Sequence, residues 1–278
     1  MINVIVDIGN NDIKYLAESK GCFSSRIHTR FEANEESFNR VEIDGVKTFI
    51  GVGELEKEYN KTDRNLTPQI LFAIHNATHE RDINLCLLLP VNQMKLKERL
   101  INRYQNTKFI SKINGIDKEI NINKCIVLPE SLCTYYSLTN PSPFQMIIDV
   151  GSKTVNWCAY ENGKLVMNDT ETIGTLDFYN TVCAIENAKG SKFKIEDIQN
   201  QINRNRITVD VREYKSFLRD IMDRIKAKID VKNYDVMFAG GGALLLKPVL
   251  VAIPSVDIHP DALYSNAIGA ANICKVKM

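Results

Sequence analysis

Two short segments of this chain join a carboxylate, a glycine and a polar turn in the same order. The first starts at Asp7, has Gly9 two residues on and ends at Lys14, and the second starts at Asp149 with Gly151 two residues on. Glycine lets a backbone approach a ligand closely, and consecutive N–H groups in a turn form a concavity for phosphate oxygens. The aspartates would hold a hydrated Mg²⁺ that neutralises those oxygens. These residue types and their spacing predict a site for a phosphorylated ligand.

The two segments also share their context in the sequence. Each aspartate lies at the end of an apolar run that is typical of a buried strand, and 142 residues separate the two (149 minus 7). One Asp-x-Gly alone is weak, because many strands end in aspartate and glycine simply to turn. Two copies in matched context indicate an internal duplication, and they predict two loops able to face one another across a cleft.

A third segment carries a further carboxylate. Pro129, Glu130 and Ser131 follow the apolar residues 124–128, where a buried strand is expected to end and a helix to begin. A carboxylate at that point could orient a water molecule for attack on a terminal phosphate. The alternative is that Glu130 only stabilises the dipole of the following helix.

A fourth segment, Gly240, Gly241 and Gly242, lies between an apolar strand at 235–239 and a predicted helix. Three glycines place bare backbone and a helix N-terminus beside a ligand, where N–H groups favour phosphate and a planar base or ribose can lie flat. The alternative is a plain connection between strand and helix. No segment has the spacing of a P-loop or of a G-x-G-x-x-G fingerprint.

The elements that must position these residues alternate between strands and helices. Continuous apolar runs predict buried strands, and apolar residues at helical spacing predict amphipathic helices. The principal expected strands are 2–6, 83–89, 124–128 and 235–239, with a hairpin at 109–122, and the principal expected helices are 68–79, 93–104, 176–187, 195–202, 214–229 and 263–273. This alternation predicts an α/β protein on parallel or mixed sheets. No linker separates the halves, so two domains would share extensive contact.

Composition narrows the class of protein. The 278 residues are 44% hydrophobic and 25% charged, as in an ordinary soluble globule, and the formal net charge of +1 gives no reason to expect direct binding to nucleic acid. No apolar run approaches ~18 residues, so we expect no membrane span. Seven cysteines without ligand-like spacing predict reduced thiols in the cytoplasm. His75 and His79 could bind a metal in principle, but no partner ligand is evident, and we expect them to be ordinary histidines on a helix surface.

Taken together, these residues resemble the superfamily of actins, heat-shock chaperones and sugar kinases, and within it the plasmid-segregating actins of the ParM type. Residues 7–14 are similar to the first phosphate loop, residues 129–131 to the segment with the water-orienting glutamate, and residues 149–154 to the second phosphate loop. Residues 240–243 resemble the adenosine motif and residues 264–270 the final connecting helix. The similarity covers essentially the whole chain.

The resemblance implies an α/β, two-domain actin-like (ribonuclease H-like) fold with a nucleotide cleft between the domains. Domain I would comprise residues 1–145 plus 262–278, and domain II residues 146–261. The implied ligands are Mg²⁺ and ATP, or GTP in its place.

The resemblance also implies roles for individual residues. Glu130 and Asp149 would be catalytic, and Asp7 and Asp149 would hold the metal. The implied nucleotide-binding residues are Asp7, Gly9, Asn10, Asn11, Lys14, Gly151, Ser152, Lys153, Thr154, Gly174, Gly240, Gly241 and Gly242.

The second phosphate loop departs from the family pattern, which ordinarily reads Asp-x-Gly-Gly-Thr-Thr-x-Asp. Ser152 replaces a glycine and restricts the turn, Lys153 adds a cation where a hydroxyl is usual, and Asn156 removes a charge. Lys153 could contact phosphate or simply point to solvent. These changes bear on the rate of hydrolysis and on nucleotide preference.

Three functions share this architecture. A small-molecule kinase of the sugar or pantothenate type would need a carboxylate base, which Glu130 or Asp149 could supply, and a chaperone would need a substrate-binding domain beyond Met278. The closest local resemblances, at residues 3–14 and 124–131, favour a polymerising actin. We therefore expect an ATPase, possibly also a GTPase, whose dynamic filaments segregate plasmid DNA in the cytoplasm. Its expected partners are copies of itself and a ParR-type adaptor bound to centromere-like DNA, with no direct nucleic-acid binding and no membrane.

Overall fold

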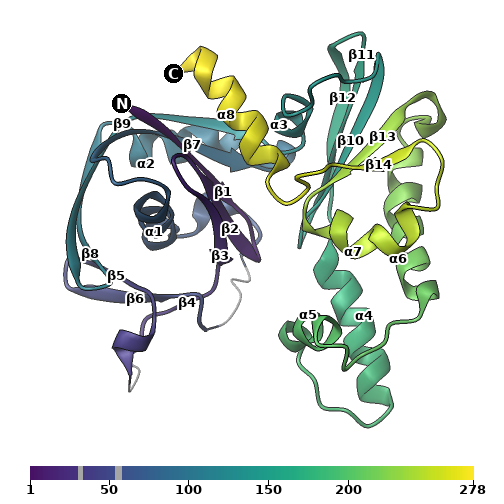
Figure 1. Ribbon diagram of the computed structural model, residues 1–278, viewed down its shortest axis with the longest axis horizontal. Helices are drawn as coiled ribbons and strands as arrows, with labels where there is room; N and C mark the ends of the chain where they lie inside the picture. Colours follow the sequence, from purple (N-terminus) through teal and green to yellow (C-terminus); the bar gives the residue numbers. More distant parts are fainter. Residues whose placement is uncertain (31–33, 54–57) are drawn as a thin grey trace. The chain divides into compact units, whose positions relative to one another are not determined.

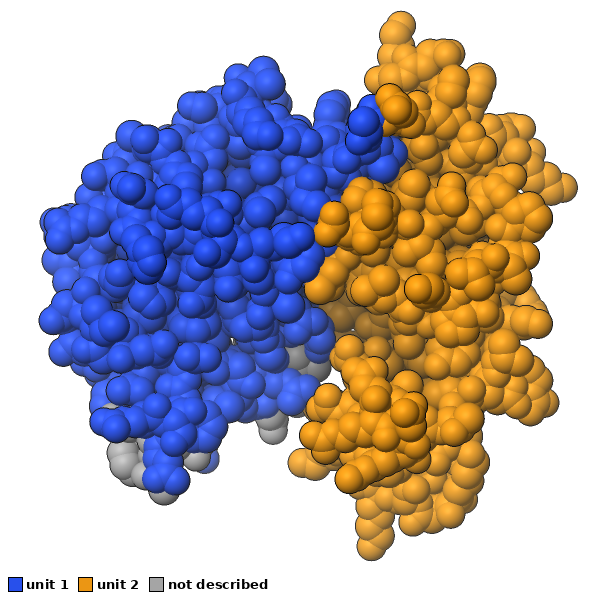
Figure 2. Space-filling model, viewed as in Figure 1, with its two compact units in different colours: residues 1–139, 264–278 blue, residues 140–263 orange. Residues whose placement is uncertain are grey.

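The computed structural model describes residues 1–30, 34–53 and 58–278. These residues form two compact units, unit 1 with residues 1–139 and 264–278 and unit 2 with residues 140–263 (Figures 1 and 2). The domain limits implied by the resemblance, 145/146 and 261/262, differ from these by a few residues and stay a prediction. Within the described residues, no helix is long and apolar enough to cross a membrane.

Unit 1 is built on a mixed sheet. Its strands are β1 (Ile2–Ile8), β2 (Asp12–Leu16), β3 (Lys20–Ser24), β4 (Ile27–His28), β5 (Arg40–Ile43), β6 (Val46–Ile50), β7 (Asp82–Leu89), β8 (Thr107–Ile113) and β9 (Ile116–Pro129). Among the described residues the sheet has nine strands, in the order β3-β2-β1-β7-β9-β8-β5-β6-β4. Strand β1 is antiparallel to β2 and parallel to β7, which is parallel to β9. The carboxyl ends of β1, β7 and β9 therefore meet at one edge of the sheet.

Helices pack on both faces of this sheet. Those of unit 1 are η1 (Glu35–Ser37), η2 (Lys61–Asp63), α1 (Thr67–Ala77), η3 (Val91–Leu96), α2 (Lys97–Tyr104), α3 (Leu132–Tyr135) and α8 (Ser265–Lys277). Strand alternation places Val4 and Val6 in the core with α1, on the inner side of the curved sheet, and Ile5 with α3 and α8 on the other face (Figure 1). Asp7 follows Ile5 by two residues in β1, so it lies on the same face of the sheet as Ile5, the face that α8 covers.

Two elements of unit 1 differ from their predictions. The predicted hairpin at 109–122 and the predicted strand at 124–128 share one long strand, β9, because its first half pairs with β8 and its second half with β7. The predicted helix at 93–104 starts as the 3-10 helix η3 and becomes α-helical only at Lys97. No side chain caps the turn that follows Pro90. The first N–H groups of an α-helix would lack partners there, and 3-10 hydrogen bonds form in this turn instead.

Unit 2 has a smaller mixed sheet with its own core. Its elements are β10 (Phe144–Val150), β11 (Val155–Glu161), β12 (Lys164–Glu171), α4 (Thr175–Ala188), α5 (Ile195–Asn203), α6 (Val211–Lys226), η4 (Val231–Asn233), β13 (Asp235–Ala239), α7 (Gly241–Leu250) and β14 (Val256–Ile258). Met146, Ile148 and Val150 of β10 pack with residues of α4 to α7 in one hydrophobic cluster. Asp149 alternates with them, so it lies on the face of β10 opposite to this core.

The two sheets repeat one topology. The order β12-β11-β10-β13-β14 in unit 2 has two antiparallel and then two parallel pairs, as does β3-β2-β1-β7-β9 in unit 1. The hairpins also have the same register, with Asp7 opposite Lys14 and Asp149 opposite Asn156. This repetition is what the two matched sequence segments predict.

Candidate functional site

The first polar hairpin, between β1 and β2, starts from a buried ion pair. Asp7 is buried at the end of β1, and Lys14 Nζ lies 3.0 Å from its Oδ2. A Cβ atom at Gly9 would clash with the carbonyl oxygen of Asp12, so this turn requires glycine by close approach.

The tip of this hairpin is fixed from outside. Asn10 is buried, and its Oδ1 accepts a hydrogen bond from Arg64 Nη1 at 2.9 Å while its carbonyl oxygen accepts one from Ser25 Oγ at 2.5 Å. Asn11 donates from Nδ2 to Asp12 Oδ2 at 2.8 Å. Hydrogen bonds from the side chains of Arg64 and Ser25 therefore hold this loop in place.

Glu130 lies just beyond the end of β9, at the same sheet edge as Asp7. Its side chain is buried, and Lys61 Nζ donates to its Oε1 at 2.5 Å. Burial raises the pKa of the Glu130 carboxyl and the charge of Asp7 acts in the same direction, while the Lys61 ammonium opposes both. An acidic group in such surroundings is a candidate for a functional role.

A strained turn follows Glu130. Ser131 has a φ of +62°, and the N–H of Leu132 donates to the carbonyl of Glu130 at 2.7 Å, which is the pattern of a γ-turn. Asn266 of α8 accepts from the Ser131 N–H and from Thr134 Oγ1, each at 2.9 Å. Strain of this kind is kept where surrounding structure enforces it, which is frequent at functional sites.

This turn also bears on the alternative interpretation, that Glu130 only stabilises the dipole of the following helix. The predicted helix begins at Leu132 and has only four residues, with Ser131 at its N-cap. A single helical turn carries a small dipole, so its stabilisation is a weak reason for a buried carboxylate.

The second polar hairpin, between β10 and β11, repeats the first with different side chains. Asp149 is buried, and its strand partner Asn156 accepts at Oδ1 from Thr170 Oγ1 at 2.8 Å. The N–H of Gly151 donates to the carbonyl of Thr154 at 2.8 Å, which closes the turn.

The start of α4 supports this second loop. The N–H groups of Thr175 and Leu176 donate to the carbonyls of Gly151 and Ser152, both at 3.0 Å. A Cβ atom at Gly174, the N-cap of α4, would clash with the carbonyl of Ser152. Loop and helix therefore approach so closely that only glycine fits at the cap. Lys153 lies partly buried in the same turn.

The triple glycine connects β13 to α7, as predicted, and packs on the second loop. Gly240 has a φ of +79°, and a Cβ atom there would clash with Asp149 Oδ1. A Cβ atom at Gly242 would clash with Val150, whereas one at Gly241 would have no atom nearer than 3.9 Å. Two of the three glycines are thus required by packing against the strand that carries Asp149.

The structure sorts the predicted site residues into two groups. Unit 1 brings Asp7, Gly9, Asn10, Asn11, Lys14 and Glu130 to one sheet edge. Unit 2 brings together Asp149, Gly151, Ser152, Lys153, Thr154, Gly174, Gly240, Gly241 and Gly242. The sequence interpretation missed Lys61 and Arg64, which lie in a polar stretch before Pro68 and carry no motif by which one sequence could identify them.

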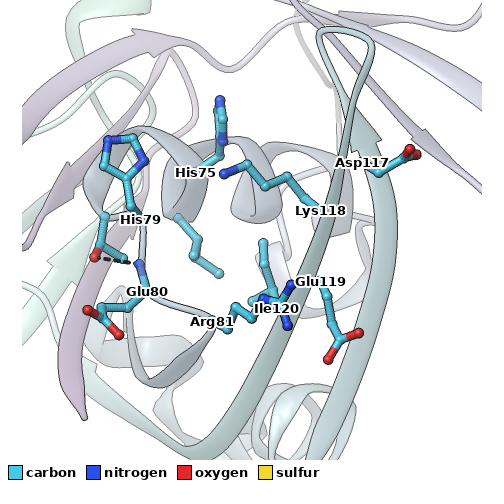
Figure 3. Close-up of a pocket in the computed structure, with 10 residues that line it drawn as sticks. His75, His79, Glu80, Arg81, Asp117, Lys118, Glu119 and Ile120 are labelled. Atoms are coloured by element: carbon cyan, nitrogen blue, oxygen red, sulfur yellow. Dashed lines mark hydrogen bonds between the residues drawn. The ribbon is translucent and has the colours of Figure 1, made fainter.

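A separate pocket in unit 1 contains the two histidines noted in the sequence. His75 and His79 line a cavity of about 130 Å³ with Arg81 and Lys118, whose side chains point into it (Figure 3). The described residues contain no group of three His, Cys, Asp or Glu side chains that could hold a metal. This pocket lies at the amino ends of β7 and β9, the opposite edge from Glu130, so it is not part of the candidate site.

Known proteins resemble this chain in its amino-terminal half and in its fold. Residues 6–132 match the N-terminal domain family of actin-like proteins. The archaeal actin homologue Ta0583 has a TM-score of 0.84 at 18% identity, with 99% of this chain and 100% of that chain covered. A ParM from Clostridium botulinum, solved as a 15-stranded filament, has a TM-score of 0.75 at 17% identity, with 99% of this chain and 99% of that chain covered. AlfA, solved as a filament bound to AMPPNP, has a TM-score of 0.67 at 20% identity, with 100% of this chain and 98% of that chain covered.

Identities this low show a shared fold alone. A search of curated protein sequences gives no match.

Proposed function

We propose that this chain, which has the actin-like fold over its whole length, hydrolyses a nucleoside triphosphate and assembles with copies of itself into filaments. The expected α/β, two-domain actin-like fold is confirmed by those relatives. The observation that carries the proposal is the pair of matched hairpins, each with a buried aspartate at the end of its first strand. Among structures with this fold, Ta0583 is known in complex with ADP and ParM as a filament.

In this proposal each hairpin is a phosphate-binding loop. Backbone N–H groups near Gly9 and Gly151 bind phosphate oxygens, and Lys14 adds positive charge beside the first loop. The glycines at 240–242 offer flat backbone to the adenosine, beside the N-terminus of α7. Lys153 in the second loop adds a cation that the related loops lack, and it is assigned an auxiliary contact with phosphate.

The acidic residues fit a magnesium ion. Mg²⁺ usually keeps several waters and takes only one or two protein carboxylates together with substrate phosphates. Asp7 and Asp149 offer one buried carboxylate in each unit, so no larger acidic cluster is required. When bound, the ion would neutralise the charge that develops on the phosphates.

Hydrolysis is assigned to Glu130. Its ionised carboxylate accepts a hydrogen bond from a water molecule and aims that water at the terminal phosphate, which leaves as inorganic phosphate. The γ-turn at Ser131 and the hydrogen bonds to Asn266 fix the point at which the carboxylate is presented. Positioning of this kind, rather than covalent chemistry, supplies most of the catalysis in phosphoryl transfer.

The biological role proposed here is the one implied by the sequence resemblance to plasmid-segregating actins of the ParM type. Filaments would form in the nucleoside triphosphate state and weaken after hydrolysis, and they would move plasmid DNA in the cytoplasm through a ParR-type adaptor. The formal net charge of +1 supports an adaptor rather than direct contact with DNA.

Light scattering with phosphate release tests this proposal. We expect scattering to rise when Mg²⁺-ATP or Mg²⁺-GTP is added above a critical protein concentration, and to fall as the nucleotide is consumed, with filaments visible by electron microscopy. Head-to-tail contacts that do not close on themselves give such filaments. A flat trace at tens of micromolar protein, with turnover stimulated by a small hydroxylated metabolite, would instead identify a small-molecule kinase.

A further inference from the structure

Lys61 is a lysine in an unusual environment. It lies in the 3-10 helix η2, and only 2% of it is exposed. Lysine is almost never buried to this degree unless its charge is paired, because removing an ammonium group from water is costly. Its partner is Glu130, itself 6% exposed, with 2.5 Å between Nζ and Oε1.

The backbone around Lys61 is fixed on both sides. Its N–H donates to Gln93 Oε1 at 3.0 Å, and Gln93 Nε2 donates to the carbonyl of Tyr59 at 3.2 Å. Arg103 of α2 donates to the carbonyls of Thr62 and Arg64, at 3.2 and 2.9 Å. Such support from neighbouring elements fixes where the Lys61 side chain begins.

The same short segment also contacts the first phosphate loop. Arg64, three residues after Lys61, is buried and donates from Nη1 to Asn10 Oδ1. Residues 61–64 therefore connect the Glu130 carboxylate with the loop that carries Asn10. A rigid link between a water-orienting group and a phosphate loop is what an in-line attack requires.

We infer that Lys61 is a positioning residue for hydrolysis, which holds the Glu130 carboxylate in register with the first phosphate loop. This inference rests on the proposed function and names a residue that the family motifs in the sequence do not contain. Lys61 acts through Glu130 and does not itself contact the nucleotide. Its loss should therefore slow turnover and leave nucleotide binding intact.

The first test compares Lys61→Met and Lys61→Arg with the parent protein. We expect Lys61→Met to lower kcat by roughly 10²-fold, while its affinity for the non-hydrolysable analogue AMPPNP stays within about threefold of the parent. Lys61→Arg keeps the positive charge and should hydrolyse at least about tenfold faster than Lys61→Met. A Lys61→Met protein that turns over at the parent rate, or that loses AMPPNP binding as its main defect, would overturn the inference.

A second test covers the case in which Lys61→Met does not fold, since that variant removes the ammonium group next to a buried carboxylate. The double variant Lys61→Met/Glu130→Gln removes both charges of the pair, and replacing a whole buried pair is usually tolerated better than removing one partner. Positioning predicts that this variant hydrolyses as slowly as Glu130→Gln alone. A further loss of about tenfold or more in the double variant would mean that Lys61 contacts the phosphates directly.

Lys108→Met is the matched control. Lys108 also pairs with a glutamate, Glu119 of β9, at 3.0 Å, but 54% and 35% of the two side chains are exposed. Its hydrolysis and AMPPNP binding should equal those of the parent. A parent that hydrolyses no nucleotide would contradict the proposed function itself, whereas an active parent with equally active Lys61 variants would contradict only this inference.

Discussion

Lys14 and Asn156 occupy equivalent positions in two hairpins of equal length, each directly opposite a buried aspartate. In the first hairpin the pair is ionic, with Lys14 Nζ 3.0 Å from Asp7. In the second, Asn156 is neutral and bonds to Thr170, while the positive charge sits at the turn on Lys153. The two matched loops therefore differ in charge and share one backbone register.

Asn156→Asp tests this difference in charge, because it introduces the aspartate that the family pattern has at this position. Asn156 is 1% exposed and faces Asp149, so a second carboxylate there would oppose a like charge across the strand pair. We expect the free energy of unfolding to fall by roughly 2 kcal/mol or more without metal. Mg²⁺ with nucleotide should recover more stability in the variant than in the parent, as measured by melting temperature. Equal melting temperatures without metal would contradict the prediction.

Asp149→Ala should remove Mg²⁺-dependent hydrolysis without unfolding the protein. Asp149 lies at the end of β10, on the face away from the core of unit 2, so its loss leaves the packing of Met146 and Ile148 intact. We expect phosphate release to fall by about 10²–10³-fold, with an unchanged circular dichroism spectrum. Asp257→Ala, an exposed aspartate on the same sheet, is the control. Hydrolysis at the parent rate would exclude Asp149 from the site.

Glu130 is expected to act in the chemical step and not in binding. Glu130→Gln should bind nucleotide and assemble, but release phosphate about 10²–10⁴-fold more slowly and give long-lived filaments. Glutamine is preferred to alanine, because its amide oxygen can still accept a hydrogen bond from the buried Lys61 ammonium, whereas alanine has no acceptor. Failure of Glu130→Gln to bind AMPPNP would make the residue structural.

Gly240→Ala and Gly241→Ala should differ sharply. Gly240 has a φ of +79° and a Cβ atom there would clash with Asp149 Oδ1, whereas the Cβ of Gly241 would lie 3.9 Å from its nearest neighbour, Leu263 Cδ1. We expect Gly240→Ala to lower the free energy of unfolding by roughly 1–3 kcal/mol and to weaken AMPPNP binding. Gly241→Ala should leave the free energy of unfolding unchanged or raise it slightly. Equal effects in a urea titration would contradict this account of the triple glycine.

His259 should make stability depend on pH. Burial lowers the pKa of His259, against the opposing charge of Asp261, and its Nδ1 accepts the Asp261 N–H at 3.0 Å. A lowered pKa means that the folded state binds fewer protons than the unfolded chain. The contribution of His259 to the free energy of unfolding is therefore present above the unfolded pKa of about 6.5 and is lost as the pH falls below that value.

The variant His259→Asn isolates this effect, because asparagine can accept the same N–H without titrating. When the pH is lowered from 7.5 to 5, the melting temperature of the parent should fall further than that of His259→Asn. The turn that begins at His259 continues to Ala262, whose carbonyl accepts a hydrogen bond from the Gly240 N–H at 2.9 Å. Protonation of His259 should therefore disturb Gly240, so AMPPNP binding by the parent should weaken as the pH falls. Superimposable profiles of parent and variant would contradict the prediction.

The sequence alone predicts those parts of the site that depend on local chemistry. A buried strand that ends in Asp-x-Gly specifies its own hairpin, because the apolar run must be covered and glycine permits the close turn. That is why the order of residues is enough to place Asp7 with Gly9, and Asp149 with Gly151, at the start of a polar turn. The triple glycine at 240–242 is placed between a strand and a helix for the same reason.

Only the tertiary structure decides contacts between residues that are far apart in the chain. Lys61 lies 69 residues from Glu130, and Asn266 lies 135 residues from Ser131. Polar residues in a loop give no period and no motif, so a sequence does not show which of them will be buried or against what. The pairing of a buried ammonium with a carboxylate depends on removing both from water, which happens only when η2 packs at the sheet edge that carries Glu130.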